Sequence, residues 1–190
     1  MIKLTEKNKL KISKWSGGKT TELKIYPENS IYEKRNFLWR VSTATVETEK
    51  SNFTKLLKIK RILMILEGKI KLIHENHYEK ILSQYEKDSF MGDWETKSFG
   101  KVTDFNLMLS KNFDGDIKKI IFKNKSISKK LEKKNTYIFY SKNGRFDFYI
   151  ENKKYTLNSE NTLEITDFDG KIIIEKYEQS TLIYAKVFKV

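Results

Sequence analysis

Short runs of β-branched and aromatic residues follow one another along this chain, and no segment shows three turns of helical periodicity. Runs of this kind, bounded by turn residues, are typical of β-strands. Many short strands at this spacing predict an all-β fold, either a sandwich or a barrel. The expected strands cover residues 37–46, 59–66, 69–74, 104–109, 136–140, 145–150, 161–165, 171–175 and 181–187.

Two glycine-containing pairs, Glu67-Gly68 and Asn143-Gly144, lie between predicted strands. Such pairs tolerate the positive φ angles of tight turns, so both are interpreted as hairpin turns. Residues 123–134 are polar and strongly charged, which indicates a linker or a surface loop.

A weak internal repeat relates the two halves of the chain. Residues 63–74 can be aligned with residues 138–150, and the turn glycines of the two copies are 76 positions apart. Two copies of an antiparallel unit predict two small β-barrels packed together, one in residues 1–112 and one in residues 113–190. The alternative interpretation is a chance similarity between β-hairpins.

The formal net charge of +13 raises the question of nucleic-acid binding. Nucleic-acid surfaces favour arginine, which makes bidentate and stacking contacts. Here only four of the 38 basic residues are arginines, and the excess charge divides evenly between the two halves. We interpret the charge as a solvated basic surface and expect no nucleic-acid partner; the alternative is a functional patch for a polyanion.

The chain has no cysteine, which excludes disulfides, thiolate metal ligands and cysteine nucleophiles. It has no apolar run approaching the ~20 residues that span a bilayer, and its first residues lack the apolar region of a signal peptide. We therefore expect a cytoplasmic protein without a membrane partner.

Polar residues gather near two predicted strands. The loop from Trp15 to Glu22 combines a large aromatic, a glycine pair, hydroxyl groups and one carboxylate, a mixture often found at sites held by a rigid scaffold. Period-two alternation places Arg40 on one strand face with Ser42 and Ala44. A buried arginine needs a carboxylate or an anionic ligand. Glu22 is a candidate partner, so Arg40 is either half of a structural ion pair or a ligand-binding cation.

Two further polar residues are candidates for the same site. Asn106 alternates with Asp104 and Met108 along a predicted strand, and its amide can both donate and accept hydrogen bonds. Asp93 follows Gly92 in a predicted turn, where it could contribute to the site. The alternative for Asp93 is a hydrogen bond to its own backbone in the turn.

Five sequence blocks together resemble the successive motifs of the HutD/Ves family, in that family's order. They lie at residues 15–22, 37–46, 61–68, 90–93 and 104–108. The second half of the chain matches only loosely. The resemblance implies a bicupin, two cupin barrels in one chain, with a small-molecule pocket in the first barrel. The residues that fall on the family's motif positions are Trp15, Thr20, Glu22, Arg40, Arg61, Asp93 and Asn106.

The resemblance also suggests a role. HutD proteins are associated with bacterial histidine utilisation, with regulation through a bound intermediate such as N-formylglutamate. The Ves branch is linked to cold response. We therefore expect a regulatory protein that binds a small polar metabolite. The alternative is a metal-independent enzyme that uses Glu22 or Asp93 as general acid or base.

Cupin metal sites usually combine three histidines with a glutamate, but this chain has only His74 and His77. His74 ends a predicted strand beside polar residues, so it is expected at a solvent-exposed tip. We expect no metal and no other cofactor.

The second barrel is expected to serve as a scaffold, because its interior positions are aromatic. These positions are Tyr137, Phe139, Phe146, Phe148 and Tyr149. An open sheet edge can pair with another chain, so a homodimer is also considered.

Overall fold

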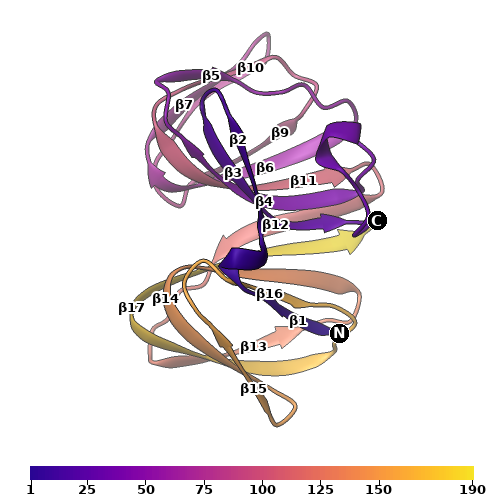
Figure 1. Cartoon of the computed structure of the whole chain (residues 1–190), viewed down its shortest axis with the longest axis vertical. Helices are drawn as coiled ribbons and strands as arrows, with labels where there is room; N and C mark the ends of the chain where they lie inside the picture. Colours follow the sequence, from indigo (N-terminus) through magenta and orange to yellow (C-terminus); the bar gives the residue numbers. More distant parts are fainter. The chain divides into compact units, whose positions relative to one another are not determined.

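A computed structural model describes all residues 1–190 and contains strands joined by loops and two short 3-10 turns, Lys7–Lys9 and Tyr32–Lys34. The expected all-β class is confirmed. The strands gather into two compact units (Figure 1). We call Lys11–Asp114 the pocket unit, and Met1–Leu10 together with Gly115–Val190 the aromatic unit.

The pocket unit consists of two antiparallel sheets. The six-stranded sheet has the order β2 (Lys11–Trp15), β3 (Gly18–Tyr26), β4 (Trp39–Val46), β11 (Val102–Ser110), β6 (Ile59–Gly68) and β9 (Lys87–Met91). The four-stranded sheet has the order β5 (Lys50–Asn52), β10 (Thr96–Phe99), β7 (Ile70–His74) and β8 (Tyr78–Leu82). Neither sheet closes on itself. Buried apolar side chains from both sheets, among them Leu63, Leu72 and Phe90, form a shared core.

The aromatic unit is built on one seven-stranded sheet. Its main path runs β1 (Ile2–Thr5), β16 (Thr162–Ile165), β14 (Asn135–Ile150), β17 (Gly170–Lys189) and β12 (Phe113–Lys119). Two more strands join it, β13 (Ser126–Leu131) on β17 and β15 (Lys153–Leu157) on β14. Figure 1 shows β14 and β17 as long, strongly curved strands.

The observed units differ from the sequence-based division in one respect. The chain passes between them after Asp114, two residues from the expected boundary. The first ten residues, however, fold with the C-terminal part, because β1 pairs with β16 through the register Ile2↔Ile165. A pairing across the whole sequence leaves no local signal in residues 1–10.

Both glycine pairs expected in hairpin turns have a different role. The strand β14 continues through Asn143 and Gly144, where its register with β17 shifts. Gly68 ends β6, which pairs with β11 and β9, whereas the next strand, β7, belongs to the other sheet. The hairpin prediction is therefore wrong at both sites. Gly144 and Gly68 have φ of 78° and 84°, and a glycine with positive φ suits a bulge as well as a turn.

The loop expected at residues 123–134 is also corrected, because its central part is strand β13, paired with β17. Its burial alternates: Ile127, Lys129 and Leu131 are partly or fully buried, and the residues between them are exposed. The alternation is hard to recognise in the sequence because a lysine, Lys129, occupies one of the partly buried positions.

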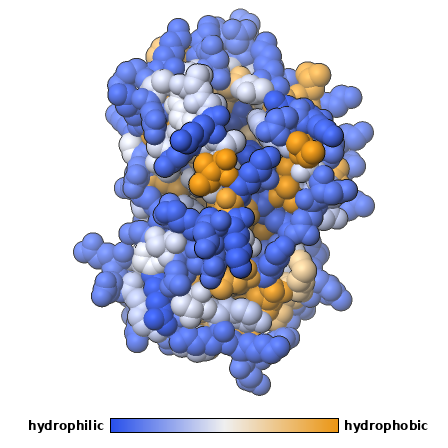
Figure 2. Space-filling view, in the orientation of Figure 1, coloured by the Kyte–Doolittle hydropathy of each residue, from blue (hydrophilic) through white to orange (hydrophobic).

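The aromatic interior expected for the second unit is confirmed at four of five positions. Phe139, Phe146 and Phe148 are fully buried, and Tyr137 is 4% exposed. Tyr149 instead lies on the surface, and its hydroxyl donates to Glu175. Figure 2 shows mainly hydrophilic side chains on the visible face, with smaller apolar groups between them. No helix has the length and apolar character that a membrane crossing requires.

Candidate functional site

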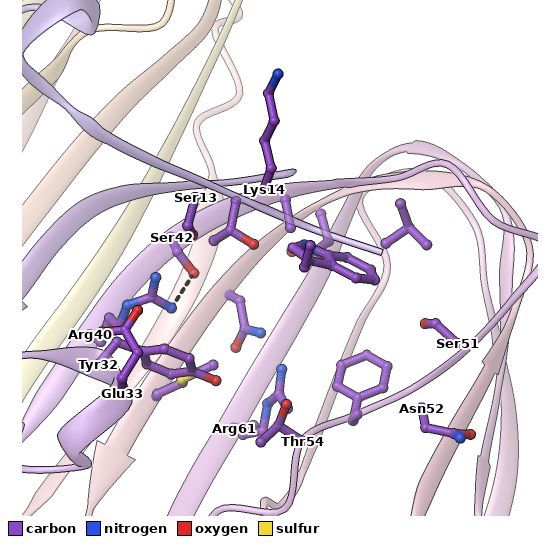
Figure 3. A pocket seen from close by; sticks show the side chains of 18 residues that line it. Ser13, Lys14, Tyr32, Glu33, Arg40, Ser42, Ser51, Asn52, Thr54 and Arg61 are labelled. Carbon is purple, nitrogen blue, oxygen red and sulfur yellow. Dashed lines mark hydrogen bonds between the residues drawn. The ribbon is translucent and has the colours of Figure 1, made fainter. Parts of the chain in front are cut away.

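The pocket unit encloses a cavity of about 310 Å³ (Figure 3). Its walls come from β2, β3, β4, β6 and β11 of the six-stranded sheet, and from residues 51–54 and the 3-10 turn that contains Tyr32. Arg40 and Arg61 point into it from different strands. A cavity of this size lies at the lower end of the range that holds small-molecule ligands.

The alternation of two neighbouring strands creates the polar wall. Arg40, Ser42 and Ala44 of β4 line the cavity, as do Asp104, Asn106 and Met108 of β11. The two strands are antiparallel, and their register places these residues in directly opposed pairs: Arg40↔Met108, Ser42↔Asn106 and Ala44↔Asp104. The expected period-two faces of both strands are thus confirmed from Arg40 and Asp104 onward.

Arg40 is held in three ways. Its Nε donates to Oε2 of Glu22 at 2.7 Å, its Nη1 donates to Oγ of Ser42 at 3.2 Å, and its guanidinium lies 4.3 Å from the ring centre of Tyr32. The residue is only 4% exposed. Both interpretations of Arg40 therefore have support, because it forms the ion pair with Glu22 and also lines the cavity.

Arg61 is a second buried cation, and it lies beside aromatic rings. Its guanidinium carbon is 4.4 Å from the ring centre of Phe53 and 5.5 Å from that of Phe90. Its Nε has no hydrogen-bond partner. Burial lowers its pKa to about 10, against the opposing effect of acidic neighbours that include Asp104. Arg61 therefore stays charged at neutral pH with an unused donor.

Two unpaired acceptors line the same cavity. Oδ1 of Asp104 and Oδ1 of Asn106 are buried and have no hydrogen-bond partner. Burial raises the pKa of Asp104 to about 7, although Arg61, the backbone N–H of Ala44 and Arg40 act to lower it. Asp104 can therefore exchange its proton near neutral pH while facing the cavity.

The raised pKa of Asp104 predicts a pH-dependent stability. The folded state binds this proton more tightly than the unfolded chain, whose carboxyl titrates near ~3.9. The contribution of Asp104 to the free energy of unfolding should fall as pH rises from about 4 to about 7. We expect Asp104→Asn, relative to wild type, to gain stability over that interval. Urea unfolding of both proteins at several pH values tests this, and a difference independent of pH would contradict it.

The structure brings together most of the residues expected at a site. Trp15, Thr20, Arg40, Arg61 and Asn106 line the cavity. Two other candidates do not line it. Glu22 forms an ion pair with Arg40, which does line the cavity. Asp93 is an exposed residue of the turn after β9.

Several residues that line the cavity were not among the site residues proposed from the sequence. These are Asp104, Ser42, Met108, Tyr32 and Phe53. The sequence already placed the first three on a strand face with Asn106 or Arg40, so they could have been proposed for the site as well. Tyr32 and Phe53 lie outside the strands, so no periodicity indicates where their rings point.

The expectation of a solvent-exposed His74 is wrong. Its strand β7 lies between β8 and β10 and alternates buried and half-buried residues, which leaves His74 1% exposed. Its Nδ1 lies 2.8 Å from Oγ1 of Thr96 and its Nε2 lies 3.0 Å from Oδ2 of Asp88. No group of three or more histidine, aspartate or glutamate side chains is arranged to hold a metal ion. This donor set does not fit a cupin metal centre.

Comparison with known proteins extends these observations. The family model described as HutD matches residues 7–183, and a search of curated protein sequences gave no match. Two solved Pseudomonas structures are similar over the full length of both chains at 16% identity. One is a conserved P. aeruginosa PAO1 protein of unknown function, with a TM-score of 0.84. The other is HutD from P. fluorescens SBW25, from a formate condition, with a TM-score of 0.78.

A more distant structure defines the fold class. The Escherichia coli pirin YhhW, solved with nickel(II), is 9% identical over the full length of both chains with a TM-score of 0.71. At this identity the similarity concerns the fold alone. The chain is therefore an all-β protein with cupin-like neighbours.

Proposed function

This chain belongs to the HutD family, and we propose that its pocket unit binds a small polar metabolite in a regulatory role without catalysis. We further propose that the two units are the two cupin-like halves of a bicupin. The two compact units and the cupin-like structural neighbours support that division.

One observation carries the binding proposal. Three buried polar atoms without a partner, Nε of Arg61 and the Oδ1 atoms of Asp104 and Asn106, belong to residues that line one cavity. A buried polar group without a hydrogen bond costs roughly 1–3 kcal/mol, and more if it is charged. Native proteins rarely keep three such atoms around one cavity without a function. A ligand that brings an acceptor to Arg61 and donors to the two oxygens would satisfy all three.

The arrangement of charges supports a ligand that carries a carboxylate. Arg40 is already paired with Glu22, so Arg61 is the cation best placed for a carboxylate. An N–H or O–H of the same ligand would then donate to Asn106 or Asp104. N-Formylglutamate, which the family resemblance suggests, has both carboxylates and an amide N–H, so we propose it or a related intermediate of histidine degradation.

Isothermal titration of the purified protein with N-formyl-L-glutamate tests the proposal. We expect saturable binding with one site per chain, and a melting temperature that rises with ligand concentration. L-Glutamate, which has an ammonium group in place of the formamide, serves as the comparison and should bind more weakly. If neither compound binds at millimolar concentration, the ligand class is wrong.

A specific observation favours an enzymatic alternative. Asp104 faces the cavity with a pKa of about 7, which suits a general acid or base at neutral pH. It is better placed for that role than the two acids suggested by the sequence, because Glu22 pairs with Arg40 and Asp93 lies away from the cavity. Proton NMR of the ligand during incubation separates the two functions. Unchanged ligand supports the regulator, and conversion that Asp104→Asn abolishes supports the enzyme.

A further inference from the structure

His74 lies on β7 of the four-stranded sheet and contacts Asp88 and Phe90 on β9 of the six-stranded sheet. We propose that His74 is a positioning residue that fixes the two phenylalanine rings against which Arg61 is held. The proposal rests on the function proposed above only in that Arg61 is taken to bind the ligand. His74 cannot touch a ligand in the cavity itself, because it is 1% exposed and does not line the cavity.

The first link runs through Phe90. Arg61 on β6 and Phe90 on β9 are directly opposed in the register, on the same face of the six-stranded sheet. The imidazole of His74 packs on Phe90, with ring centres 4.5 Å apart. His74 therefore limits how far the Phe90 ring can move away from the guanidinium of Arg61.

The second link runs through Thr96 to the other ring. His74 is hydrogen-bonded to the Thr96 hydroxyl at 2.8 Å, and the Thr96 carbonyl accepts the backbone N–H of Phe53 at 2.9 Å. The rings of Phe53 and Phe90 meet edge to face at 5.9 Å. His74 thus contacts Phe90 directly and is linked to Phe53 through Thr96 and through the contact between the two phenylalanine rings.

Hydrogen bonds on both ring nitrogens fix the imidazole. The Asp88 carboxylate can only accept, so Nε2 carries the proton and donates to it. The Thr96 hydroxyl then donates to Nδ1, so a neutral imidazole has both nitrogens satisfied. Asp88 also accepts from Tyr78 and Lys80 of β8. This network joins β9 to β7, β8 and β10.

The electrostatic setting keeps the imidazole neutral. Burial lowers the pKa of His74, as do His77 and Lys80, and Asp88 acts in the opposite direction. At neutral pH the ring is therefore an uncharged side chain that contacts residues of both sheets. Its role depends on geometry and not on a change of charge.

The decisive measurement uses the unliganded protein and the NMR signal of the Arg61 Nε–H. Its chemical shift reports ring currents from Phe53 and Phe90, and its exchange rate reports how firmly the side chain is held. We expect His74→Phe, which removes both hydrogen bonds, to move this signal and to speed its exchange. The Nε–H of Arg40, paired with Glu22, is the internal reference and should stay in place.

Two further variants separate positioning from general stability. His74→Gln retains an amide that can donate and accept, so the Arg61 signal should return toward its wild-type position. His77→Gln is the matched control, because His77 lies on the same hairpin, stacks on Trp94 and is exposed; it should leave the Arg61 signal unchanged. If His74→Phe does not fold, Thr96→Val replaces the hydroxyl with a methyl group of similar size and should move the Arg61 signal in the same direction. An unmoved Arg61 signal in the folded variant overturns the proposal.

Ligand affinity supplies an independent readout with N-formyl-L-glutamate as the probe. We expect His74→Phe to weaken binding about tenfold in the wild-type background, within the usual range of such coupling. In an Arg61→Lys background the same change should have no further effect, because a lysine does not use the two rings in the same way. Additive losses would overturn the proposal. If the wild-type protein does not bind the probe, the proposed function fails, while the NMR result still decides the role of His74.

Discussion

Arg61→Met is expected to weaken the binding of N-formyl-L-glutamate by at least about 30-fold, because a buried charged hydrogen bond typically contributes 2 kcal/mol or more. The guanidinium of Arg61 is the buried cation of this cavity that no carboxylate hydrogen-bonds. A ligand carboxylate would find no replacement for it, since Arg40 is held by Glu22. Isothermal titration of both proteins measures the loss directly.

The same substitution should leave the free energy of unfolding unchanged or raise it. Burial already lowers the pKa of Arg61, which means that the fold opposes the charge. Methionine fills a similar volume against Phe53 and Phe90 without that cost, and replacing buried charges by apolar side chains is often neutral or stabilising. Asp104 can respond by keeping its proton, because its pKa is already about 7.

Arg145→Met is the control for the loss of an arginine elsewhere, since Arg145 lies in the aromatic unit. It should not change ligand affinity. If Arg61→Met binds the ligand as tightly as wild type, Arg61 does not contact the ligand. If Arg61→Met severely lowers the free energy of unfolding, the role of Arg61 is structural.

Glu22→Ala is expected to lower the free energy of unfolding by about 3 kcal/mol, because it leaves a buried cation without its counter-ion. The Nε of Arg40 and Oε2 of Glu22 are 2.7 Å apart, and their side chains are only 5% and 15% exposed. The remaining hydrogen bond to Ser42 cannot neutralise the guanidinium. Urea unfolding at pH 7 measures the effect.

An exposed acid near the same cavity provides the matched control. Glu33 lines the cavity, its side chain is 63% exposed, and it lies 4.0 Å from Lys11, so Glu33→Ala should change stability by no more than about 0.5 kcal/mol.

The stabilisation of Glu22→Ala and wild type by bound ligand distinguishes the two roles of Arg40. If Arg40 can also hold an anion, the ligand should stabilise Glu22→Ala more than wild type. Equal stabilisation would leave Arg40 as half of a structural pair.

The local part of the site could be predicted because strand alternation is a property of the backbone. Once residues 38–44 and 104–109 were assigned as strands, a period of two placed Arg40 with Ser42, and Asp104 with Asn106, on shared faces. The opposed pairs in the structure follow from that pattern and from one register. The same reasoning could have predicted that Asp104 belongs to the site, because it shares a strand face with Asn106.

The role of the glycine pairs could not be predicted, because a glycine with positive φ suits both a hairpin turn and a bend within a strand. Gly68 and Gly144 do adopt positive φ. Whether such a residue ends a hairpin or bends a continuing strand depends on which strands pair with it. Near Gly144 the paired residues of β17, Tyr177 and Thr181, lie more than thirty residues further along the chain.

The sequence by itself determined the all-β class, the family and the strand faces that carry Arg40 and Asn106, since these depend on local periodicity and local motifs. Only the tertiary structure decided how deeply each polar residue is buried and which residues it contacts. It buried His74 against Asp88, left Asp93 exposed and paired the first strand with residues 162–165. The physical reason is that burial and pairing arise between strands distant in sequence, where no local pattern records the partner.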